Sequence, residues 1–166
     1  KSNPTLFEWA ASPIVYMETE FAGQFRNVMN TYFSTKKSLY HYISMAEGNY
    51  REFLRGANVK AKKYFYVMRP VLACRWILEK GTPPPMRFTE LMAAELPENL
   101  LPELEHLLEL KMNAPEIKEI PRIDMLNEYL DTSITEIKNL LLDMDDTKKM
   151  EWEILNQMFL KFISVN

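Results

Sequence analysis

The segment from residue 60 to residue 80 constrains the fold most, because it is apolar on almost every side of a helix. Its apolar residues are Tyr64, Phe65, Val67, Met68, Val71, Leu72, Cys74, Trp76, Ile77 and Leu78. A helix that is apolar all round is buried, so this segment belongs in the middle of a helical bundle. Pro70 lies inside it and removes one backbone donor, which predicts a kink.

The rest of the chain repeats its apolar residues with the same helical spacing. This periodicity predicts further helices near residues 4–12, 19–32, 36–55, 88–96, 99–112, 123–143 and 150–165. A break near Asp131 and a short strand over residues 14–16 stay open as alternatives. With 4 glycines among 166 residues, hairpin-rich β folds and Gly-rich phosphate loops are disfavoured. The prediction is an all-α fold, an irregular bundle of about seven to eight helices around a Pro-kinked central helix.

Charge divides the chain at the Pro-rich connector that follows the central helix. Residues 36–87 hold 11 of the 20 Lys and Arg residues and 3 of the 23 Asp and Glu residues, whereas residues 88–166 hold 7 and 17. We therefore expect a basic helical core over residues 1–87 and an acidic helical tail over residues 88–166, packed as one compact unit. The basic part could bind a polyanion, and the acidic part could also offset its charge.

The residue types that carry most enzyme chemistry are scarce. The single cysteine, Cys74, and two histidines cannot form a disulfide or a multi-Cys zinc site. Glu103 and His106 share a helical face, but a di-metal site needs a second such motif, so a solvated pair is favoured. Asp143 and Asp145 follow a Leu-rich helix, which favours a helix terminus over a Mg²⁺ site. We predict no catalytic residue and no metal site in this chain.

No apolar run is long enough to cross a bilayer, since a spanning helix needs about 20 such residues. The sequence therefore predicts a cytoplasmic protein that makes no membrane contact.

A candidate anion-binding surface lies on the predicted central helix. Lys62, Tyr66 and Arg69 fall within about 60° of one another at 100° per residue. Two cations with a phenol between them could bind a phosphate or a stacked base, and a solvated face is the plainer alternative. Arg75 falls nearly opposite and is expected to be a buried structural arginine paired with an acid. Asn49 is the polar member of one face of the preceding helix.

Three blocks of sequence then follow one another in a specific order. The first is Asn-Pro-Thr-Leu-Phe-Glu-Trp (3–9) with Ser-Pro-Ile-Val-Tyr (12–16), and the second is His-Tyr (41–42) with Ala46, Asn49 and Tyr50. The third is Lys-Lys-Tyr-Phe-Tyr-Val-Met-Arg-Pro (62–70), leading to Ala-Cys-Arg-Trp (73–76), Pro-Pro-Met (84–86) and Phe88. In this order they resemble the predicted nucleotidyltransferases of the DNA polymerase β-like superfamily, of the RNA-ligase-associated type. The resemblance covers about residues 3–92, and the acidic remainder is similar only loosely.

The resemblance implies a catalytic part that this sequence does not contain. Such proteins begin with a small α/β palm, whose Gly-Ser and Asp-x-Asp residues bind the metals and a nucleoside triphosphate. This chain has no Gly-Ser dipeptide, so we expect it to be the helical domain of a longer parent and to be inactive alone. For the parent, the resemblance implies Mg²⁺ and a nucleoside triphosphate as cofactor and substrate. The implied partners are its own palm, a nucleotide and RNA.

The resemblance also assigns candidate residues to nucleotide or phosphate binding. Lys62, Lys63, Tyr66 and Arg69 are the first candidates, and Asn49 and Arg75 are the second. On a straight helix Lys63 projects away from Lys62, so the two lysines need not act together. The alternative function is a non-catalytic helical adaptor whose acidic surface binds a protein partner.

Overall fold

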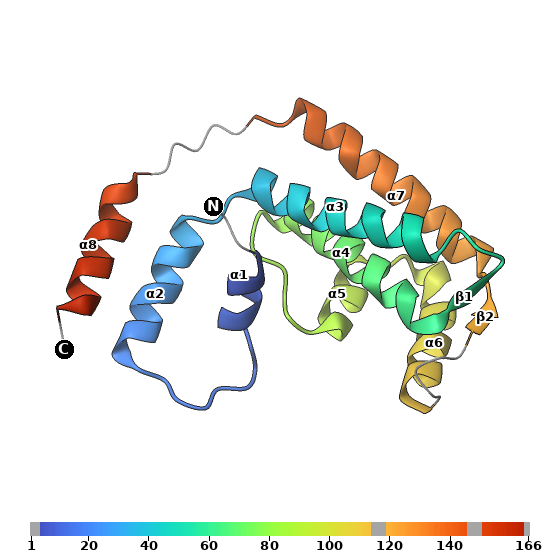
Figure 1. Cartoon of the computed structure of the whole chain (residues 1–166), viewed down its shortest axis with the longest axis horizontal. Helices are drawn as coiled ribbons and strands as arrows, with labels where there is room; N and C mark the ends of the chain where they lie inside the picture. The colour runs from blue at the N-terminus through green and yellow to red at the C-terminus, as the bar shows by residue number, and fades with distance from the viewer. Residues whose placement is uncertain (1–3, 114–118, 146–150, 165–166) are drawn as a thin grey trace.

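The computed structural model describes residues 4–113, 119–145 and 151–164, and these residues are mostly helical (Figure 1). The described residues contain eight α-helices, one 3-10 turn and two short strands. In chain order they are α1 (Pro4–Ala10), α2 (Glu20–Thr31), α3 (Thr35–Phe53), β1 (Asn58–Lys60), α4 (Ala61–Lys80), α5 (Phe88–Glu95), η1 (Glu98–Leu100), α6 (Leu101–Asn113), β2 (Glu119–Pro121), α7 (Asp124–Asp143) and α8 (Trp152–Ile163). The predicted all-α bundle is confirmed.

Helix α4 is the centre of the bundle, as its apolar surface predicts. Helices α3, α5, α6 and α7 all pack against it. Four of its large side chains are completely buried, namely Tyr64, Met68, Leu72 and Ile77. Because neighbours surround α4, few of its side chains are exposed, namely Tyr66, Glu79 and Lys80.

The structure decides between local alternatives that the sequence left open. Helix α7 runs unbroken through Asp131, and residues 14–16 form neither helix nor strand. An antiparallel strand pair lies elsewhere, with Val59 opposite Ile120. Helix α4 continues through the buried Pro70 without interruption, and a bend there stays a prediction.

A buried hydrogen-bond network joins α3, α4 and α7. The Tyr64 hydroxyl donates to Asn127 Oδ1 at 2.7 Å and accepts from the Ile123 amide at 2.7 Å. Asn127 Nδ2 donates to the Leu54 carbonyl, just past α3, at 2.7 Å. Burial raises the pKa of Tyr64, so this phenol stays protonated. The network fixes α7 against the end of α3 and the start of α4.

Helix α8 lies beside α2, away from the central bundle (Figure 1). None of its described side chains is buried, and its ring contact is between Phe162 and Phe21, whose centroids are 4.2 Å apart. Among the described residues, no helix is long and apolar enough to cross a membrane.

Candidate functional site

Arg69 of α4 is held by a carboxylate from the first helix. Its guanidinium lies 3.5 Å from Glu8 Oε1, and the Tyr42 hydroxyl donates to the same oxygen at 2.9 Å. Burial raises the pKa of Tyr42, and the neighbouring Glu8 charge raises it further. Glu8 therefore orients both donors, and Arg69 keeps its position although its side chain is 30% exposed.

These side chains line a small pocket where α1, α3 and α4 meet. The pocket has a volume of about 100 Å³. Its lining residues are Pro4, Thr5, Glu8, His41, Tyr42, Met45, Arg69 and Pro70. A pocket of this size could admit one small group, such as part of a phosphate, but not a whole nucleotide.

Lys63 forms a second cationic point further toward the start of α4. Its Nζ lies 3.4 Å from the centroid of the Phe53 ring and 4.6 Å from that of the Tyr66 ring. The helical angle alone placed Lys63 off the Lys62 stripe, but its long side chain reaches back over both rings. Lys63 therefore contacts Tyr66, which is 46% exposed, and that Lys62 and Lys63 need not act together stays a prediction.

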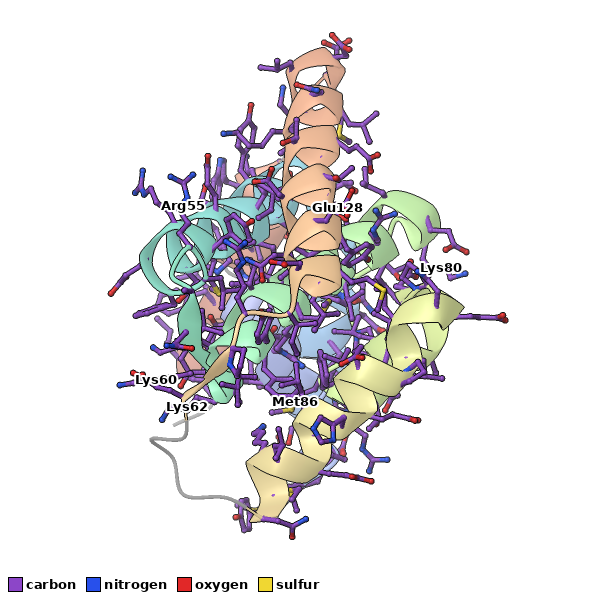
Figure 2. The ribbon with its side chains drawn as sticks, turned by 90° about the vertical axis from the view of Figure 1, so that its right-hand side faces the viewer. Arg55, Lys60, Lys62, Lys80, Met86 and Glu128 are labelled. Atoms are coloured by element: carbon purple, nitrogen blue, oxygen red, sulfur yellow. The ribbon has the colours of Figure 1, made fainter. Side chains whose placement is uncertain are left out.

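The other two candidates of this region are Asn49 on α3 and Lys62 near the start of α4. The Asn49 amide donates to the Met45 carbonyl of its own helix at 2.8 Å, so one of its donors is already in use. Lys62 is partly buried and lies next to Lys60, on the same side of Figure 2 as Arg55, whereas Lys80 is on the opposite side. The start of α4 and the end of α3 thus present several cations on one side of the molecule.

Arg75 lies in a different environment from the other candidates. It lines an open groove of about 410 Å³ between α4, η1 and α7. It donates to the buried Ser133 Oγ at 2.9 Å, lies 3.4 Å from Glu136 and stands 5.3 Å from the Tyr129 ring centroid. The expected pairing with an acid is present, but the side chain is 34% exposed rather than buried.

The candidates thus have different contacts. Lys63 lies against Phe53 and Tyr66, Arg69 lies against Glu8, and Arg75 lies against Ser133 and Glu136 of α7. Sequence reasoning missed the role of Glu8, although this residue stands within the first of the three matching blocks. Its side chain meets Arg69 across 61 positions of sequence, a contact that local periodicity does not reveal.

No group of three or more His, Cys, Asp or Glu side chains gathers anywhere in the described ranges. Asp143 and Asp145, at the end of α7, are exposed, and this agrees with their interpretation as a helix terminus.

Comparison with known proteins shows the family of the chain. The chain matches RlaP, the RNA repair pathway DNA polymerase beta family, over residues 1–161. The chain belongs to this family.

A curated relative is similar over almost the whole chain. It is the uncharacterized protein YcgL of Bacillus subtilis (strain 168), with 42% identity over 165 residues. The alignment covers 98% of this chain and 64% of that protein, so the chain spans less than two thirds of the relative's length. No solved structure matches the chain.

Proposed function

We propose that this chain is the nucleotide-facing helical domain of a metal-dependent nucleotidyltransferase. The parent protein would transfer a nucleotidyl group from a nucleoside triphosphate to an acceptor, and the family description favours RNA as that acceptor. Two contacts on α4 support the proposal, that of Lys63 Nζ with the Tyr66 ring and that of Arg69 with Glu8. We refer to Lys63, Tyr66 and Arg69 as the strip. The catalytic palm would lie in the part of the parent outside this chain.

The strip has the chemistry that such a domain needs. Phosphoryl and nucleotidyl transfer depend on positioning and on neutralising charge at the phosphate oxygens. Arg69 and Lys63, with Lys62 beside them, would hold those oxygens, because guanidinium and ammonium groups form charge-assisted hydrogen bonds with phosphates. The exposed Tyr66 ring offers a face on which a base can stack.

The metal ions of the proposed reaction do not fit the residues described here. The described side chains lack a cluster that could hold Mg²⁺, so the proposal assigns no metal ligand to them. Their part is to bind and orient the substrate. We accordingly expect the isolated chain to incorporate no labelled nucleotide with any metal ion, and metal-dependent incorporation would contradict this division of roles.

Binding measurements on the full-length parent test the proposal directly. Lys63→Ala and Arg69→Ala should each weaken triphosphate binding by about 1.5–3 kcal/mol, roughly 10- to 150-fold, if the site excludes water. Titration calorimetry measures this loss. Binding by the unchanged protein should also weaken as salt rises, because the contacts are ionic.

Lys80→Ala is the matched control for these two variants. Lys80 is also on α4, is exposed and pairs with Glu79, far from the strip (Figure 2). Its loss should leave triphosphate affinity unchanged. If the Lys63→Ala/Arg69→Ala double variant also binds triphosphate and RNA normally, the result contradicts the proposal and favours the non-catalytic adaptor.

A further inference from the structure

Four consecutive apolar residues between α1 and α2 are strongly exposed. The exposed fractions are 66% for Ile14, 54% for Val15, 98% for Tyr16 and 80% for Met17. In Figure 1 this connection projects from the end of the molecule, between the two blue helices. A contiguous exposed apolar run of this kind typically marks an interaction site.

The composition of this segment is typical of a buried β-strand. Ile, Val and Tyr favour strands, and Pro13 before them is tolerated at the first strand position. Successive side chains of a strand point to opposite faces, so a run without polar alternation is stable only when both faces are covered. Yet this segment forms no strand and covers neither face in the structure.

The backbone of the segment is equally unpartnered. The Ile14 amide donates to Ser12 Oγ at 3.2 Å, a local contact within the turn. Within the described ranges, the amides and carbonyls of Val15, Tyr16 and Met17 make no hydrogen bond. An extended segment with unpaired backbone groups and apolar side chains can add a strand to the edge of a sheet.

The segment follows the short helix that carries part of the candidate site. It begins soon after Glu8, whose carboxylate accepts from Arg69 and Tyr42. Trp9, on the same short helix, is 69% exposed. Exposed apolar side chains are thus found both on α1 and in the segment that follows it.

We propose that residues 14–17 add a strand to the edge of a β-sheet in the part of the parent protein outside this chain. The relative YcgL contains polypeptide beyond the aligned region, because the alignment covers 64% of its length. Attachment within one polypeptide gives a high effective concentration, so even a short strand pairing is stable. The inference rests on the proposed function in one respect, namely that the catalytic part belongs to the same protein.

Hydrogen exchange in the full-length parent tests the pairing without any nucleotide. The amides of residues 14–17 should include positions that exchange at least about 100-fold more slowly than in an unstructured peptide. Exchange at the unstructured rate throughout the segment would overturn the inference. Since the readout needs no triphosphate, it succeeds or fails independently of the binding measurements at Lys63 and Arg69.

Two substitutions test whether the segment pairs with another part of the same protein. Val15→Asp should remove the protection and lower the melting temperature of the parent, because a carboxylate cannot be buried between two apolar faces. Met112→Asp is the control, since Met112 is also an apolar side chain, 81% exposed on α6, and its change should alter neither quantity. Equal, negligible effects of both variants would overturn the inference. Protection that appears only as protein concentration rises would also overturn it, since the occupant would then be a second copy of the protein.

Discussion

Arg69 and Arg75 stand six positions apart on α4 and lie in opposite electrostatic surroundings. Arg69 has one acidic partner, Glu8, and shares its strip of helix with Lys63. Arg75 pairs with Glu136 in a groove that Glu128 also lines. In Figure 2, Glu128 lies on α7, apart from Lys62 at the edge of the molecule. One carboxylate thus balances the charge of Arg69, whereas two carboxylates outnumber Arg75 in its groove.

The comparison shows that a basic stretch of sequence is not a single site. The basic residues of α4 are divided by the direction in which each side chain leaves the helix and by the element that packs there. Helix α7 brings carboxylates to one side, and α1 brings a single carboxylate to the other. Arg75 joins α4 to α7 through Ser133 and Glu136, and its assignment to phosphate binding stays a prediction.

The largest expected effect comes from the hydrogen-bond network that positions α7 against α4. Asn127→Ala should lower the free energy of unfolding by about 2–4 kcal/mol, because it leaves the buried Leu54 carbonyl without its donor and the Tyr64 hydroxyl without its acceptor. Urea unfolding measures the change. Asn139→Ala, at an exposed position of the same helix, is the control and should change stability by less than about 0.5 kcal/mol. Equal stabilities of the two variants would contradict a structural role for the network.

The central position of α4 could be predicted from sequence, because apolar residues on every side of a helix leave burial as the stable outcome. The contacts of the site could not be predicted to the same extent. Glu8 reaches Arg69 through packing of α1, and Lys63 reaches Tyr66 through rotations of a flexible side chain. The strands β1 and β2 have three residues each, too few to show a periodic pattern. Contacts between distant segments and side-chain rotamers are thus what sequence periodicity leaves undetermined.

Arg69 and Arg75 should respond differently to substitution by alanine. Arg75→Ala should leave triphosphate affinity of the parent within about twofold while lowering the free energy of unfolding by roughly 1 kcal/mol, because Ser133 loses its donor. Arg69→Ala should do the reverse, with a loss of at least about tenfold in affinity. Calorimetry measures the triphosphate affinity of both variants, and urea unfolding measures their free energies of unfolding. A loss of affinity as large for Arg75→Ala as for Arg69→Ala would remove the distinction.

A smaller effect is expected from the carboxylate that holds Arg69. Glu8→Gln keeps an oxygen that accepts from Tyr42 and Arg69 but removes a negative charge next to the proposed phosphate site. Triphosphate affinity should rise by roughly two- to tenfold, about 0.5–1.4 kcal/mol at the dielectric of a protein surface. Glu128→Gln is the control, since it removes the same charge in the Arg75 groove and should not change this affinity. Weaker binding by Glu8→Gln would instead show that the charge of Glu8 is needed to position Arg69.

The smallest effect concerns the ionisation of Tyr42, which lies beside Glu8, and of Tyr129, which lies beside Arg75. Burial raises the pKa of both Tyr42 and Tyr129, but Glu8 raises the pKa of Tyr42 further, whereas Arg75 lowers that of Tyr129. Because the folded pKa lies above the ordinary value of about 10, the stability that each phenol contributes is complete below that pH and is lost as pH rises. Tyr129 should therefore ionise before Tyr42 in the folded protein. Phenolate absorbance measured before alkaline unfolding should fall in Tyr129→Phe and stay unchanged in Tyr42→Phe. The opposite order would mean that Glu8 and Arg75 do not set the local charge in the way that the contacts of Arg69 and Arg75 indicate.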